Sequence, residues 1–398
     1  MLFAALLALA TGCGSGGTYV APKPTAVASI DPGQATLTLE SLANAVRRGD
    51  ADAARTFGSD AATGDRLAAM AENVTTIGLK DVALTYLAEN GGGTFDGSWG
   101  ATVEVAWRVD GFDDRRAATE VDVDFADGGQ KVSGVGDAQQ ATPLWLTGPV
   151  TVRRAPGAMV IATTPAKVAD TLIAEARAAV ARDRQVLGGD PHLVIEAPRS
   201  VQELQRALGA QAPAYADIAG VTAPVDGNRV AGTPVHVFIN PVVFHTMKPI
   251  AAQVVVTHES VHAVTNAPLS GSAPLWLVEG FADYVALGSG PAARLPLSRT
   301  AGQISAQVRK HGAPRALPAD TDFSGNGGTD LGPTYEAAWL ACVTIADHAG
   351  QDALIRLYRD VLGGTPVEEA LPQDTGLSLA SLTDAWRSRL EATASSLS

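Results

Sequence analysis

Two short segments of the chain carry residue types that can bind a metal ion and use it. Residues 257–263 read Thr-His-Glu-Ser-Val-His-Ala, so His258 and His262 are four residues apart. On a helix, both imidazoles leave the same face about one turn apart. They can therefore share one Zn²⁺, for which imidazole nitrogens are common ligands. Glu259 follows the first histidine and can reach a water molecule that the metal activates.

The second segment supplies two carboxylates at the same spacing. Residues 276–284 read Trp-Leu-Val-Glu-Gly-Phe-Ala-Asp-Tyr. A catalytic zinc takes three protein ligands and keeps one open position, so Glu279 is the expected third ligand. Asp283 lies one turn further on, where it can accept a hydrogen bond from the far nitrogen of a ligand histidine. A solvated helix residue is the alternative interpretation of Asp283, and the hydrophobic residues are expected to pack in the core.

The residues around the two histidines favour a helix. Pro249 suits a first helical turn, and residues 251–263 are rich in Val and Ala, as in a buried helix. The valines alone would also suit a buried strand. A strand, however, would separate His258 and His262 by about twice the spacing that a shared metal needs.

Together, the two segments resemble the gluzincin metallopeptidases, and most closely the peptidase MA-like branch that includes the aminopeptidase N family. The resemblance implies that His258, His262 and Glu279 bind one Zn²⁺. It also implies that Glu259 is the general base for hydrolysis of a peptide bond in a peptide or protein substrate. The resemblance covers roughly residues 147–398 and is most specific around the metal ligands.

Two further stretches resemble the same family. Tyr335 lies in Thr-Tyr-Glu-Ala-Ala, similar to the stretch in which these enzymes place a tyrosine that donates to the oxyanion; a buried structural tyrosine is the alternative. Residues 235–240 alternate and are rich in β-forming residues, and the resemblance implies that this strand forms the edge of the cleft, where an extended peptide can add. The histidines not expected to bind metal are His192, His236, His245, His311 and His348.

One feature of those aminopeptidases is missing. They carry a Gly-x-Met-Glu-Asn stretch that grips the free amino terminus of the substrate, and residues 226–232 contain nothing similar. A substrate ammonium would have no obvious counter-charge there. An endopeptidase is therefore favoured over an aminopeptidase, and an exopeptidase that anchors its substrate in another way is the alternative.

The N-terminus has the pattern of an export signal. Residues 2–10 are apolar but too few to span a membrane, and Ala-Thr-Gly-Cys at 10–13 resembles a bacterial lipobox. Residues 1–13 are thus expected to be a signal peptide, Cys13 the lipidated residue, and 14–34 a flexible tether. The protein would then be anchored on the outer side of the cytoplasmic membrane; an ordinary cleaved signal with an incidental cysteine is the alternative. Cys342, the other cysteine, is expected to be a buried small hydrophobe.

The remaining chain predicts an α+β protein with two domains, at residues 35–146 and 147–398. The first should be a curved antiparallel sheet preceded by helices; it weakly resembles the nuclear transport factor two-like superfamily, which favours a scaffold or ligand-binding role. Its expected helices are at 37–48, 51–57 and 65–73, and its strands at 75–87, 101–109, 117–125 and 130–135. The second domain should contain strands at 150–154, 158–163 and 192–196 and helices at 166–185, 201–208, 299–310, 334–349, 351–362 and 379–397.

Composition narrows the possible partners. The net charge is −13 and no long basic patch is present, which argues against nucleic-acid binding. Two alternatives to a peptidase stay open. The chain could be a catalytically silent scaffold that binds a partner through its N-terminal module. It could also hold a structural zinc, with a fourth ligand supplied by the Gly- and Asp-rich loop at residues 311–333.

Overall fold

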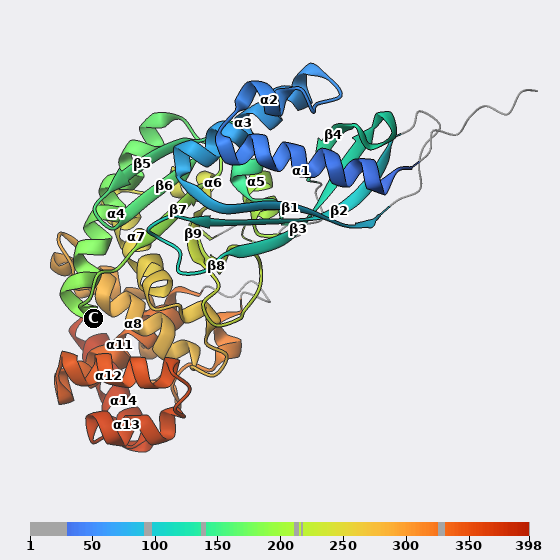
Figure 1. The fold of residues 1–398 in the computed structure, drawn as a ribbon. Coiled ribbons are helices and arrows are strands. Elements are labelled where there is room, and N and C mark those ends of the chain that lie inside the picture. The colour runs from blue at the N-terminus through green and yellow to red at the C-terminus, as the bar shows by residue number, and fades with distance from the viewer. Residues whose placement is uncertain are drawn as a thin grey trace, which may run out of the picture.

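The structure is a computed structural model that describes residues 30–90, 98–136, 141–210, 215, 218–324 and 331–397. The predicted signal peptide, Cys13 and most of the predicted tether lie outside the described residues. Within the described ranges, no helix has both the length and the apolar character needed to cross a bilayer. The fold is α+β, with a helix-and-sheet module at the N-terminus and a helical region at the opposite end (Figure 1).

The N-terminal module contains the predicted helices followed by an antiparallel sheet with the order β1-β2-β3-β4. Helix α1 begins at Pro32 rather than at residue 37, because the Asp31 side chain caps the helix by accepting from the backbone N–H of Gln34. The helices cover one face of the sheet (Figure 1). The elements are α1 (Pro32–Arg48), α2 (Ala51–Arg55), α3 (Ala61–Ile77), β1 (Leu79–Glu89), β2 (Trp99–Val109), β3 (Ala117–Ala126) and β4 (Lys131–Val135).

The interior of this module is packed rather than hollow. Alternate residues of β2 and β3 are buried against the helices, as the alternating pattern predicts. The apolar cavity between α1, α3 and the sheet measures only about 10 Å³, and it is lined by residues such as Leu39, Met70 and Val103. A space of that size holds about one water molecule, so it offers no room for an organic ligand.

A second sheet follows, with the order β5-β6-β7-β9-β8. Strands β5 and β6 form the predicted hairpin, while β6, β7 and β9 run parallel. The expectation that residues 235–240 form the cleft edge is wrong, because β9 lies inside the sheet and β8 is the edge strand next to the helix that carries His258 and His262. The elements are β5 (Thr151–Ala155), β6 (Ala158–Ala162), α4 (Ala166–Leu187), β7 (Leu193–Ala197), α5 (Val201–Ala207), β8 (Gly220–Pro224) and β9 (Val235–Ile239).

Both faces of the second sheet are covered. One face packs on α4 and on α7 (Pro249–Val264). The other face carries Ile161, Val194 and Phe238, which belong to one continuous hydrophobic cluster with the N-terminal module. The N-terminal module therefore packs against the face of the second sheet that is opposite α7.

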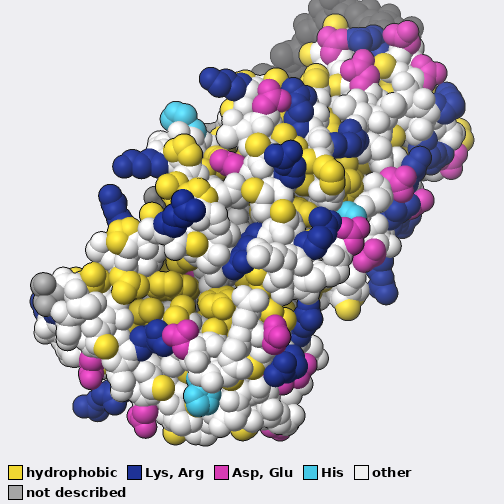
Figure 2. Space-filling view, turned by 90° about the vertical axis from the view of Figure 1, so that its left-hand side faces the viewer, with side chains coloured by type: hydrophobic (Ala, Val, Ile, Leu, Met, Phe, Trp, Pro, Cys, Tyr) yellow, Lys and Arg dark blue, Asp and Glu magenta, His cyan; other side chains and the backbone are white. Residues whose placement is uncertain are grey.

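The helical region begins with α6 and α7 and ends with α14, and α12, α13 and α14 lie together at the bottom of Figure 1. The single helix predicted at 299–310 is two helices that meet at Ala301, and α13, which contains Pro372, was not predicted. The elements are α6 (Pro241–Phe244), α7, α8 (Leu275–Leu287), α9 (Leu297–Thr300), α10 (Gly302–His311), α11 (Gly332–Ala349), α12 (Gln351–Leu362), α13 (Val367–Thr375) and α14 (Leu379–Ser396). On the face shown in Figure 2, hydrophobic side chains gather across the lower middle of the molecule, with acidic and basic side chains scattered around them.

Candidate metal centre

Helices α7 and α8 bring three donor atoms together. The Nε2 atoms of His258 and His262 lie 3.0 Å apart. Oε2 of Glu279 lies 3.1 Å from Nε2 of His258 and 3.4 Å from Nε2 of His262. The convergence that the sequence predicted is therefore present, with two ligands from one helix and the third from the next.

These donors fit a zinc ion. Four donors at about 2.0–2.1 Å around a tetrahedral centre lie about 3.3 Å from one another, close to the three distances between these side chains. His258, His262 and Glu279 form the group of donor atoms within 4.8 Å that could hold a metal, and no fourth His, Cys, Asp or Glu of the described residues joins them. Residues 325–330 of the loop considered as a source of a fourth ligand lie outside the described residues.

Asp283 fixes the orientation of the first ligand. Nδ1 of His258 lies 2.8 Å from Oδ1 of Asp283, so the ring donates its Nδ1 proton to this carboxylate. Nε2 is then the nitrogen that faces Glu279 and His262, and it would bind a metal through its lone pair after losing its proton. Asp283 thus contacts the far nitrogen of His258, as the sequence predicted, and its side chain is only 17% exposed.

The electrostatics of the group favour a cation. Burial alone would lower the pKa of His258, but the nearby Asp283 and Glu279 carboxylates outweigh it and hold the pKa well above its usual value. Burial likewise acts to raise the pKa of Glu279, yet the two histidines hold that pKa far below its usual range. The carboxylates thus attract positive charge to the point where the three donors meet, which is also where a metal would bind.

Glu259 follows His258 on α7, and its side chain reaches the edge strand β8. Its Oε2 accepts a hydrogen bond of 2.6 Å from the hydroxyl of Thr222 on β8. Sequence reasoning identified Glu259 but not Thr222. The two residues are 37 positions apart, and no local pattern in the sequence indicates that a short strand runs past Glu259.

Tyr335 on α11 faces the same group. Its ring centre lies 6.2 Å from that of His258 and 5.4 Å from that of Phe323, which packs edge-on against it. The pKa of Tyr335 is raised, first by burial and then by the negative charges of Glu279 and other carboxylates of the site. The phenol therefore keeps its proton at neutral pH and can donate it in a hydrogen bond.

A close helix contact explains how α8 and α11 meet. Any side chain at Gly280 would overlap the carbonyl oxygen of Ala338 on α11. Glycine therefore lets the two backbones approach, which places Glu279 and Tyr335 in one site. The hydrophobic neighbours in the same segment pack in the core as expected, with Trp276 and Phe281 buried.

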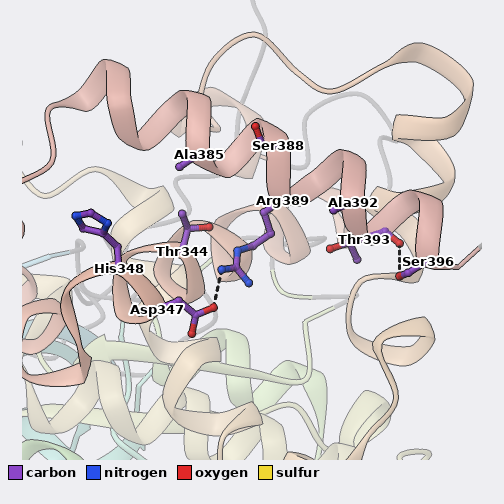
Figure 3. Close-up of a pocket in the computed structure, with 9 residues that line it drawn as sticks. All are labelled: Thr344, Asp347, His348, Ala385, Ser388, Arg389, Ala392, Thr393 and Ser396. Atoms are coloured by element: carbon purple, nitrogen blue, oxygen red, sulfur yellow. Dashed lines mark hydrogen bonds and ion pairs between the residues drawn. The ribbon is translucent and has the colours of Figure 1, made fainter.

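The other histidines lie apart from this group. His236 is buried between two carboxylates, with Nδ1 2.9 Å from Oε1 of Glu196 and Nε2 3.1 Å from Oδ1 of Asp113. His348 is exposed on α11 in a shallow hollow beside α14, where Arg389 pairs with Asp347 (Figure 3). The remaining exposed histidines are His192, His245 and His311. Cys342 is fully buried and burial raises its pKa, as expected for a non-nucleophilic cysteine.

Comparison with known proteins adds no family to this geometry: no protein-family model matches the chain, and no curated protein matches it at a significant level.

Proposed function

We propose that this protein is a zinc-dependent peptidase that cleaves peptide bonds within a chain. The observation that carries the proposal is the convergence of His258, His262 and Glu279 at distances suited to one Zn²⁺. Three protein donors leave room for substrate, whereas structural zinc sites close with four. Glu259 and Tyr335 supply the protein groups that hydrolysis needs next to such an ion.

Each residue then has a role in the reaction. Zn²⁺ bound to the three ligands would supply the Lewis acidity that polarises a peptide carbonyl and acidifies water. Glu259 takes a proton from the attacking water and delivers it to the leaving amine. Tyr335 donates its phenolic proton in a hydrogen bond to the oxyanion that develops, and removal of one such donor typically costs about 2.7–4 kcal/mol of transition-state stabilisation.

Strand β8 is the best candidate for substrate binding. It pairs with β9 on one side and lies at the edge of its sheet beside α7. An extended peptide can add to such an edge through main-chain hydrogen bonds. The substrate would then run along β8 with its scissile bond next to Glu259.

The preference for an endopeptidase rests on the sequence, in which residues 226–232 have no Gly-x-Met-Glu-Asn stretch. Asp226 is the carboxylate of the segment at residues 226–232. Its Oδ1 accepts from the N–H of Asn228 and its Oδ2 from the N–H of Ala118 in the N-terminal module. The proposed location, on the outer side of the membrane through a lipid on Cys13, rests on the sequence pattern at residues 1–13.

The scaffold alternative has less support. A silent scaffold needs neither a base at Glu259 nor a tyrosine facing the ligands. Among the described residues of the N-terminal module, the apolar cavity between the helices and the sheet measures only about 10 Å³ and could not hold an organic ligand.

The test is cleavage of a mixed peptide library by the purified protein, with and without a chelator. Hydrolysis should stop on zinc removal and return when zinc is added. New termini should arise from internal bonds, which separates an endopeptidase from an exopeptidase. Glu259→Gln should keep one zinc and lose hydrolysis. If the fully zinc-loaded protein cleaves no peptide of the library, the proposed peptidase function is excluded.

A further inference from the structure

The hydroxyl of Thr222 makes the closest polar contact to the proposed general base. Its Oγ1 lies 2.6 Å from Oε2 of Glu259 and 3.0 Å from the main-chain oxygen of the same residue. A hydroxyl has one proton to donate. The shorter contact is to the charged acceptor, and charge-assisted hydrogen bonds are the stronger ones. The proton therefore goes to the carboxylate.

Two residues of β8, Gly220 and Thr222, contact the Glu259 side chain. Residues two apart on a strand face the same side, so Gly220 and Thr222 both face α7. A Cβ atom at position 220 would lie 3.1 Å from Cγ of Glu259. The Glu259 side chain thus passes over the bare backbone of Gly220 and ends at the hydroxyl of Thr222.

The strand that presents this hydroxyl is held on several sides. It pairs with β9 along its length, and Val221 and Ala223 face the other way and pack against the hydrophobic cluster of the N-terminal module. The turn after β8 is tied to the same module, because Arg115 donates to the carbonyl oxygen of Ala231. A hydroxyl on such a strand has little freedom to move.

We propose that Thr222 is a positioning residue that holds the Glu259 carboxylate in the orientation needed to accept a proton, an inference that rests on the proposed peptidase function. A free glutamate side chain has three torsions and samples many rotamers. The bond from Thr222 selects one of them. The same strand would bind the substrate main chain, so the base and the substrate would be held by one element.

Two substitutions separate the hydroxyl from the shape of the side chain. Thr222→Val keeps the branched shape and removes the hydroxyl, whereas Thr222→Ser keeps the hydroxyl and removes the methyl group. With zinc-loaded protein and a peptide cleaved by the wild type, Thr222→Val should lower kcat about 10- to 100-fold. Its KM should stay within about twofold, because ground-state binding is not changed. Thr222→Ser should recover kcat to within about threefold of the wild type.

The zinc content and the crystal structures of the wild type and Thr222→Val complete the test. The inference requires one zinc in both proteins and a Glu259 carboxylate that leaves β8 in the variant. A variant with wild-type kcat, or one in which Thr222→Ser is as impaired as Thr222→Val, overturns it. If the zinc-loaded wild type cleaves no peptide, the peptidase proposal fails by itself. The positioning role is then decided by the two structures: an unmoved carboxylate in Thr222→Val refutes it, and a displaced one supports it.

Discussion

The buried ion cluster around His236 allows a stability prediction with a magnitude. His236 on β9 contacts Glu196 on β7 and Asp113 from the loop after β2, and all three are less than a tenth exposed. Both ring nitrogens face carboxylates, so the ring is held as an imidazolium that links the N-terminal module to the second sheet. His236→Gln removes this cation and leaves two buried carboxylates without their partner, which typically costs 3–5 kcal/mol.

The pKa of His236 gives a similar magnitude and its pH dependence. Burial acts to lower this pKa, but Asp113 and Glu196 raise it from 6.5 to about 9. At about 1.4 kcal/mol per pH unit, the shift corresponds to about 3 kcal/mol of stability. Because the folded-state pKa is the higher one, this stability is complete below pH 6.5 and is lost as the pH rises through about 9.

Urea unfolding of the zinc-free protein between pH 6 and 9.5 measures the effect. At pH 6 the free energy of unfolding of the wild type should exceed that of His236→Gln by about 3 kcal/mol, and the difference should shrink toward pH 9.5. His258 is present in both proteins, so its contribution cancels in the difference. His311 is exposed, so the free energy of unfolding of His311→Gln should stay within about 0.5 kcal/mol of the wild-type value at every pH. A His236→Gln difference that is below about 1 kcal/mol at pH 6, or independent of pH, would refute the buried imidazolium.

Three further substitutions test other contacts. Asp283→Asn should weaken zinc binding about 10- to 100-fold while keeping one zinc per chain, as measured by chelator competition, and unchanged affinity would contradict the orienting role. Gly280→Ala should lower the free energy of unfolding by about 1–3 kcal/mol through overlap with α11, whereas Gly271→Ala, with no atom near its Cβ position, should not. Asp183 is fully buried, and burial raises its pKa from 3.8 to about 7. The folded state therefore loses stability as the pH rises between these two values. Asp183→Asn should raise the free energy of unfolding by up to about 4 kcal/mol at pH 8 and by little at pH 4.

The ligand set was predictable because its geometry is local. His258 and His262 share one helix face through their spacing, and Glu279 and Asp283 share another. The packing of α8 against α7 was the one non-local step, and the resemblance to a family supplied it. The position of Tyr335 followed in the same way, and the structure brings its ring to within 6.2 Å of that of His258.

The edge strand of the second sheet was not predictable from local patterns. Strand β8 has five residues, begins with Gly220 and ends with Pro224, a composition more typical of a turn than of a strand. Its register against α7 is set by tertiary packing, so the contact from Thr222 to Glu259 could not be inferred. Strand β9 was correctly predicted, but sequence alone does not tell which strand lies at the edge of a sheet.

The most direct test of the metal site is an anomalous difference map at the zinc edge from crystals of the zinc-loaded protein. One peak should lie within bonding distance of Nε2 of His258, Nε2 of His262 and the Glu279 carboxylate, with no fourth protein ligand. A zinc ion bound elsewhere, a fourth side chain that closes its coordination, or the absence of any peak would contradict the proposed site.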